Sequence, residues 1–230
     1  MRTRTDIAAY RSAVPLALVS DIHGNDLALA AVVAELERLD VEQVVCLGDV
    51  AQGGSQPAEV LDRLARLGWP VILGNADAFL LEVDPSSPEP ATDEQLERRT
   101  WTLEQLSDAQ LEQIRAFVPT LDVEVDGVTL RAFHGSPHSY DDIVLPETPD
   151  AVAERLLGGS GVDLLAGGHT HLQWTRYVDG ALYVNPGSVG LAYNRFESDP
   201  VPIEVAEYAI VTGGSVEFRR VPWHQPAELR

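Results

Sequence analysis

Short apolar runs alternate with amphipathic stretches over the first third of the chain, and this alternation is the strongest constraint on the fold. Apolar runs at residues 16–19, 43–47 and 70–73 predict buried strands, each of which ends at a polar residue or a glycine. Between them, residues 25–39 and 57–67 have the apolar spacing of helices. A β-α-β-α-β order implies parallel strands joined by right-handed crossovers, so we expect an α/β fold.

The pattern is interrupted after the third apolar run. Residues 84–92 are rich in proline and serine and predict a loop, and residues 93–106 and 107–117 then have helical spacing. Ser107 and Gln110 have the spacing of a capping box at the start of the second helix. We therefore expect residues 84–118 to form a small helical insertion that covers part of the core.

The last part of the chain has the two-residue period of strands. The dipeptides Asp126-Gly127 and Asp179-Gly180 separate alternating segments and predict tight hairpins, and a third hairpin is expected within residues 201–221. We expect one domain over residues 14–222, preceded by a flexible N-terminal tail at residues 1–13 and followed by a tail at residues 223–230.

Composition excludes several classes of partner. With 16 Lys and Arg against 36 Asp and Glu, the formal net charge is −20, so we expect no binding to long nucleic acids or to anionic membranes. The single cysteine excludes an internal disulfide framework and fits a cytoplasmic protein. An anionic substrate would need local positive charge in so acidic a protein, and a bound metal is the usual source of it.

Nitrogen and oxygen donors gather where the predicted strands end. Ligands of open α/β sheets collect at the carboxyl ends of strands, and imidazole, carboxylate and amide donors suit divalent transition metals. Each motif alone has an ordinary structural explanation as a turn, a helix cap or a buried histidine. Seven donors in this order are too many for one metal with an open position and suit two. They are Asp21, His23, Asp49, Asn75, His134, His169 and His171.

These motifs resemble those of the calcineurin-like metallophosphoesterases, in particular the small bacterial phosphoesterases. The resemblance rests on Asp21-Ile-His23, Gly48-Asp49, Gly74-Asn75, His134-Gly135 and Gly168-His169-Thr-His171, together with the segment at residues 185–190, and it spans residues 16–211. It implies two packed, mixed β-sheets flanked by helices, the four-layer sandwich of that superfamily.

The resemblance also implies roles for the seven donors. Asp21, His23 and His171 would bind one divalent metal, Asn75, His134 and His169 a second, and Asp49 would bridge both. A hydroxide between the metals would attack phosphorus in line. We expect manganese, with iron, zinc, cobalt or nickel as alternatives, because mixed ligation suits all of them.

The sequence departs from the family pattern at Ala76, where many members have a histidine thought to protonate the leaving group. His138 is a candidate substitute, although a surface loop histidine is an equal reading. Asn25 and Arg195 are candidate substrate contacts. The residues expected to take part directly in catalysis are Asp49, Asn75, His134 and His138.

Three functions fit the sequence. The leading one is a dinuclear metal-dependent phosphoesterase that hydrolyses a small phosphomonoester or phosphodiester, with nucleotides among the candidate substrates. The alternatives are a phosphoprotein phosphatase and a non-catalytic scaffold that keeps the fold for protein binding, which the alanine at position 76 would favour. Neither the oligomeric state nor the identity of the substrate can be read from the sequence.

Overall fold

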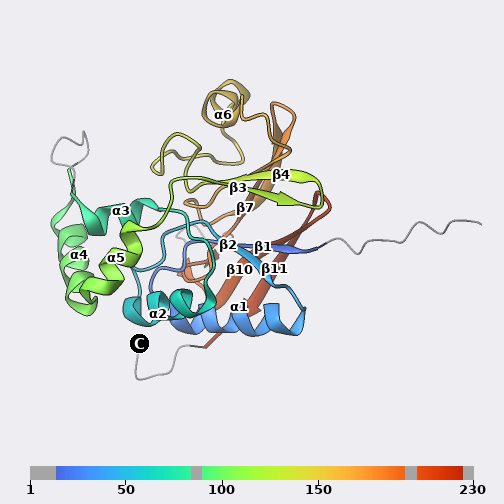
Figure 1. Ribbon diagram of the computed structural model, residues 1–230. Coiled ribbons are helices and arrows are strands. Elements are labelled where there is room, and N and C mark those ends of the chain that lie inside the picture. The colour runs from blue at the N-terminus through green and yellow to red at the C-terminus, as the bar shows by residue number, and fades with distance from the viewer. Residues whose placement is uncertain (1–13, 84–89, 195–200, 225–230) are drawn as a thin grey trace, which may run out of the picture.

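The computed structural model describes residues 14–83, 90–194 and 201–224. The predicted N-terminal tail, most of the predicted C-terminal tail and Arg195 lie outside the described residues. Figure 1 shows two sheets packed face to face, with helices on both outer sides. Within the described parts of the chain, no helix is both long and apolar enough to cross a membrane.

The first sheet contains both ends of the fold. Its strands are β1 (Leu16–Val19), β2 (Gln43–Cys46), β10 (Val205–Thr212) and β11 (Ser215–Pro222), in the order β11-β10-β1-β2. The predicted parallel pairing of β1 with β2 is confirmed, and β10 is antiparallel to both of its neighbours. Residues 70–73 do not form the expected third strand, because only Val71 bridges to this sheet.

The second sheet is built from the C-terminal half of the domain. Its strands are β3 (Leu121–Val125), β4 (Val128–Ala132), β5 (Leu164–Ala166), β7 (Ala181–Pro186) and β6 (Gln173–Val178), listed in their spatial order. The strands β4, β5 and β7 are parallel, whereas the two hairpins are antiparallel. Two short strands, β8 (Tyr193–Asn194) and β9 (Val201–Pro202), pair separately.

The predicted hairpin turns have the expected backbone. Asp126 and Gly127 have φ values of 53° and 78°, and Asp179 and Gly180 have φ values of 47° and 83°. A two-residue type I′ turn, whose twist matches that of the flanking strands, requires positive φ at both central residues. Asp followed by Gly adopts these angles at low steric cost.

Alternating side chains of the strands explain the four layers. On β1, Leu16 and Leu18 pack between the two sheets, whereas Ala17 and Val19 face α1 (Asp26–Arg38) and α2 (Pro57–Leu67). On the outer face of the second sheet, Phe133, Leu165 and Tyr183 pack with Leu157 of α6 (Asp150–Leu157). Figure 1 shows α1 and α2 on one outer side and α6 on the other. The fold is therefore the predicted α/β sandwich of two mixed sheets.

The two helices expected within residues 84–118 are present. The helices α4 (Asp93–Gln105) and α5 (Asp108–Arg115) follow α3 (Asn75–Leu81), and both pack against α2 and α3. Capping boxes at Thr92 and Ser107 start them, the second as predicted. The Arg99 side chain donates to the carbonyl oxygens of Phe79 and Leu80. This contact places α4 beside the C-terminal end of α3.

Candidate metal centre

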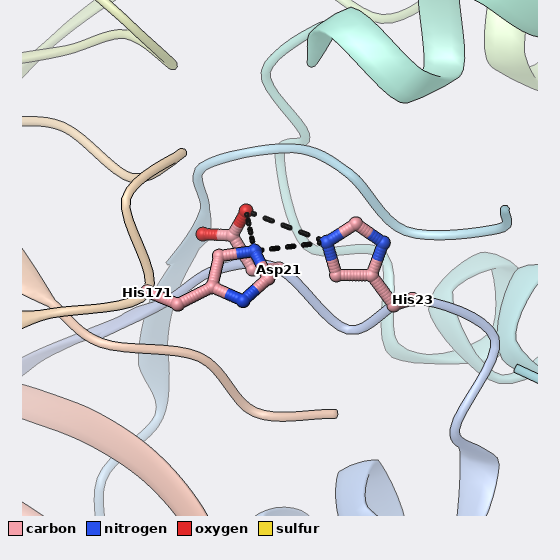
Figure 2. A group of neighbouring side chains, drawn as sticks. All are labelled: Asp21, His23 and His171. Atoms are coloured by element: carbon pink, nitrogen blue, oxygen red, sulfur yellow. Dashed lines mark hydrogen bonds and ion pairs between the residues drawn. The ribbon is translucent and has the colours of Figure 1, made fainter. Parts of the chain in front are cut away.

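The first group of donors comes from loops after β1 and β5. His23 Nε2 and His171 Nε2 lie 3.0 Å apart, and Asp21 Oδ1 lies 3.7 Å and 3.2 Å from these two atoms. Figure 2 shows the two imidazoles and the carboxylate pointing toward one common point. The three side chains are therefore arranged as a candidate metal-ligand group.

Hydrogen bonds to the other ring nitrogens decide which tautomer these histidines adopt. Nδ1 of His23 lies 2.7 Å from the Gln52 carbonyl oxygen, and Nδ1 of His171 lies 2.9 Å from that of Leu191. A carbonyl only accepts, so both Nδ1 atoms donate, and in the neutral rings the lone pairs of both Nε2 atoms face each other. Asp21 Oδ1 is buried and has no hydrogen-bond partner within the described residues. Converging lone pairs beside an unsatisfied carboxylate oxygen fit a divalent cation.

The second group comes from the loops after β2, β4 and β5 and from the start of α3. His134 Nε2 is 3.0 Å from Asn75 Oδ1 and 3.4 Å from Asp49 Oδ2, and its Nδ1 donates to the Leu47 carbonyl oxygen over 2.7 Å. The His169 ring lies against that of His134, with centroids 5.1 Å apart. Asp49, His134 and His169 meet the geometry of a second ligand group, and Asn75 adds an amide oxygen.

One oxygen of Asp49 connects the two groups. Asp49 Oδ2 lies 3.4 Å from His134 Nε2 and 3.8 Å from His23 Nε2, so it faces both sets of donors. Its other oxygen, Oδ1, accepts a hydrogen bond from the Ala76 backbone N–H over 2.8 Å. Asp21 is anchored in the same way, because its Oδ2 accepts from the His169 N–H over 3.1 Å. Each carboxylate thus keeps one oxygen on the backbone and presents the other to the centre.

The charges of the centre are strongly coupled. Burial alone would raise the pKa of Asp21 and of Asp49, but the neighbouring histidines outweigh burial and hold both pKa values below the ordinary range. Burial alone would likewise lower the pKa of His134, but Asp49 and Asp21 raise it to about 10. In the metal-free protein a proton on His134 therefore provides positive charge that bound cations would replace.

The ligand loops have an unusual backbone conformation. Five of the seven donors have positive φ, with values from 47° to 69°: Asp21, His23, Asp49, His169 and His171. Non-glycine residues rarely adopt this left-handed region, and each costs on the order of 1–3 kcal/mol. The i, i+2 spacing of Asp21 with His23 and of His169 with His171 predicts extended segments with both side chains on one side, and the positive φ values show that prediction to be wrong. The paired ligands converge through turns rather than along one side of a strand.

The buried carboxylate of Asp77, which is not one of the seven candidate metal ligands, supports the loop that carries Asp49. Asp77, in the first turn of α3, accepts hydrogen bonds from the backbone N–H groups of Asp49, Val50 and Gly74 at 2.8, 3.0 and 3.3 Å. Burial and the nearby charge of Asp49 raise the pKa of Asp77 to about 7. The bond to Gly74 belongs to the capping box of α3, whereas the contact with Asp49, across 28 positions, has no local signal in the sequence.

The segment at residues 185–190 holds the loops of the first group. The Asn185 side chain donates to the Gly168 carbonyl oxygen and to Thr170 Oγ1, and Ser188 Oγ donates to the Asp21 carbonyl oxygen. Gly168 must be a glycine, because a Cβ there would lie 2.0 Å from Ser20 Oγ. Only the resemblance of this segment to a family motif drew attention to it in the sequence.

The remaining predicted site residues lie elsewhere or have other partners. Asn25 caps α1, accepting from the Ala28 N–H, and donates to the Gly190 carbonyl oxygen. His138 is exposed and lines a hollow with Pro137 and Arg131 that contains none of the seven donors. The structure therefore does not bring His138 to the centre, because the turn after Ser136 directs it outward. Arg195 is not among the described residues.

Comparison with known proteins gives the family. The model of the calcineurin-like phosphoesterase superfamily domain matches residues 15–209. The chain belongs to this superfamily. An uncharacterized protein of Methanocaldococcus jannaschii is 25% identical to this phosphoesterase-family chain over 179 residues, which cover 76% of the chain and 70% of that protein.

Solved structures confirm the fold of the superfamily. A hypothetical protein from Pyrococcus horikoshii is similar with a TM-score of 0.79 and 21% identity, covering 92% of this chain and 89% of that one. A metallophosphoesterase from Sphaerobacter thermophilus is similar with a TM-score of 0.70 and 24% identity, with coverage of 92% and 89%. At these identities the likeness concerns the fold alone.

Proposed function

We propose that the protein is a dinuclear metal-dependent phosphoesterase that hydrolyses a small phosphomonoester or phosphodiester. The observation that carries this proposal is the position of Asp49 Oδ2 between the two donor groups, 3.4 Å from His134 Nε2 and 3.8 Å from His23 Nε2. A carboxylate in that position suits two neighbouring cations. Manganese is the proposed metal, and the cytoplasm is the proposed location.

The chain's own residues would hold and orient the reacting groups. When bound, two divalent cations would lower the pKa of a coordinated water and neutralise the charge of a phosphoryl group. Backbone carbonyls fix Nδ1 of His23, His134 and His171 as donors, so that each Nε2 is directed at the centre. The turns of positive φ at His23 and His171 hold those two rings toward the centre, which would limit the reorganisation needed for reaction.

The two alternatives differ in what they would require of the centre. A non-catalytic scaffold has no need of strained ligand loops or of an unsatisfied buried carboxylate oxygen at Asp21. A phosphoprotein phosphatase would use the same centre, but the net charge of −20 would repel acidic phosphopeptides. Both features favour an enzyme with a small substrate.

Reconstitution with Mn²⁺ tests the proposal. The metal-free protein is loaded, its metal content is measured by elemental analysis, and hydrolysis of p-nitrophenyl phosphate and bis-p-nitrophenyl phosphate is followed. We expect metal-dependent turnover that Asp49→Asn abolishes. Asp122→Asn is the matched control, because this carboxylate pairs with Arg131 at the surface. Absence of turnover in the loaded protein, or undiminished turnover in Asp49→Asn, would refute the proposal.

A further inference from the structure

A cavity of about 290 Å³ opens beside the second donor group. Asn75, a donor of that group, forms part of its wall, and Ala76 follows directly. The Ala76 N–H is the group that anchors Asp49 Oδ1, so the cavity starts within one residue of the bridging carboxylate. We call this cavity the Ala76 pocket; its polar and small lining residues include Gln52, Asn75, Ala76, Glu82, Gln95 and Asp141.

The Ala76 pocket offers hydrogen-bond acceptors and negative charge. Gln52 is 9% exposed, and its Oε1 is buried without a hydrogen-bond partner among the described residues. An unsatisfied buried acceptor is costly, which points to a donor supplied by a ligand. Glu82 and Asp141 add two carboxylates, and no Lys, Arg or His is among the described residues that line the pocket.

The environment of Asp141 agrees with this reading. Burial raises the pKa of Asp141, and His169 and His134 oppose that rise only in part. The charges of Asp49 and Asp142 add to the rise, and the exposed Asp141 side chain is open to a ligand in the pocket. Tyr140, next to it, is 38% exposed and presents an aromatic ring to the same pocket, and aromatic rings attract organic cations.

Ala76 supplies the space. A bulky side chain at this position would project from the first turn of α3 beside Asn75, whereas a methyl group leaves that wall open. A substrate whose phosphoryl group lay at the metal centre would then have room for its alcohol portion against Gln52, Glu82 and Asp141. A second phosphate in this position would meet two carboxylates and no cation from the protein.

We propose that the Ala76 pocket binds the alcohol portion of the substrate and selects an alcohol that carries an ammonium group. This inference rests on the proposed function, because it assumes that the phosphoryl group binds at the metal centre. The favoured substrate class is a phosphate ester of a small amino alcohol. Esters whose alcohol portion is anionic are disfavoured.

Three esters that differ at one terminal group test the inference. They are 2-aminoethyl phosphate, propyl phosphate and 2-carboxyethyl phosphate, whose terminal groups are cationic, neutral and anionic. Calorimetric binding to the Mn²⁺-loaded protein and kcat/KM for hydrolysis are both measured. We expect the aminoethyl ester to be preferred over the propyl ester, and the carboxyethyl ester to be the poorest of the three.

The variant Glu82→Gln/Asp141→Asn tests the cause of the preference. A solvent-exposed ion pair changes binding by about twofold to fivefold, so each carboxylate removed should reduce the aminoethyl-to-propyl ratio by that factor. Comparing ratios between variant and wild type cancels the different intrinsic reactivities of the esters. Glu204→Gln is the matched control, because Glu204 lines a different cavity that reaches the centre at His23.

The outcomes separate this inference from the proposed function. The inference is overturned if the wild type shows no preference, if the double variant retains it, or if only Glu204→Gln reduces it. Turnover of p-nitrophenyl phosphate without any such preference would leave the proposed function standing alone. A binding preference lost in the double variant, with no turnover of any ester, would support the pocket and refute the hydrolase.

Discussion

Replacing Asn185 with alanine should reduce stability and metal affinity together. The side chain is fully buried and makes three hydrogen bonds, to the Gly168 carbonyl oxygen at 2.6 Å, to Thr170 Oγ1 at 3.1 Å and from the Gly187 N–H at 3.0 Å. At about 1 kcal/mol for each neutral bond, Asn185→Ala should lower the free energy of unfolding by about 3 kcal/mol. In a chain of this size that corresponds to a fall in Tm of roughly 6–12 °C.

The effect on metal binding follows from what Asn185 holds. Gly168 and Thr170 flank His169 and precede His171, so loosening them should move donors of both groups. Loss of such supporting contacts typically lowers metal affinity by about 10–100-fold. Urea unfolding of the metal-free protein and Mn²⁺ titration by calorimetry measure the two effects separately.

A control of equal instability isolates the positioning role. Leu64→Ala truncates a buried side chain of α2 and should lower the free energy of unfolding by about 2–5 kcal/mol. Unlike Asn185, a leucine side chain forms no hydrogen bond to a ligand loop. We expect Leu64→Ala to bind Mn²⁺ as the wild type does. If Asn185→Ala is destabilised yet binds Mn²⁺ with unchanged affinity, the loops do not depend on Asn185 and the reasoning is wrong.

Three further results are expected. Gly74→Ala should weaken Mn²⁺ binding measured by calorimetry, since a Cβ would lie 2.1 Å from Asp49 Oδ1 and 2.4 Å from Asp49 N. Gly127→Ala is the control, because a Cβ there meets nothing within 4 Å. Cys46 should resist iodoacetamide in the native protein at pH 8, because burial raises its pKa far above the ordinary value, and rapid alkylation without unfolding would contradict this. Arg63→Ala should lower stability by about 1 kcal/mol in urea unfolding, since it removes a half-buried pair with Asp26 at 2.6 Å, and should leave Mn²⁺ binding unchanged.

Local pattern predicts the first two strands and the donors, whereas the layers of two packed sheets are implied only by the family resemblance. Short apolar runs indicate buried strands such as Leu16 to Val19, and strand ends indicate where polar side chains meet. The seven donors follow from the second of these patterns. The absence of His138 from the centre could not be predicted, because the direction of a side chain in a loop depends on irregular contacts that no periodic pattern reveals, such as the hydrogen bond from Ser136 Oγ to Asp142.

The same limit explains the error about the ligand loops. Spacing of i and i+2 in an extended segment would place Asp21 and His23 on one side, yet both residues have positive φ. What imposes the turn lies far away in the chain: the Asp21 N–H donates to the Gly48 carbonyl oxygen and the His23 N–H to that of Asp49. A pattern within three residues cannot reveal hydrogen bonds to a loop almost thirty positions later.

The strain of the centre and the strength of the fold are connected. Five donors in the left-handed region cost several kcal/mol if each costs on the order of 1 kcal/mol or more. The core between the sheets and the anchoring of Asp21 and Asp49 by backbone N–H groups oppose this cost. The strained turns therefore depend on packing and hydrogen bonds elsewhere in the domain, so substitutions that weaken those contacts should loosen the donors as well as the fold.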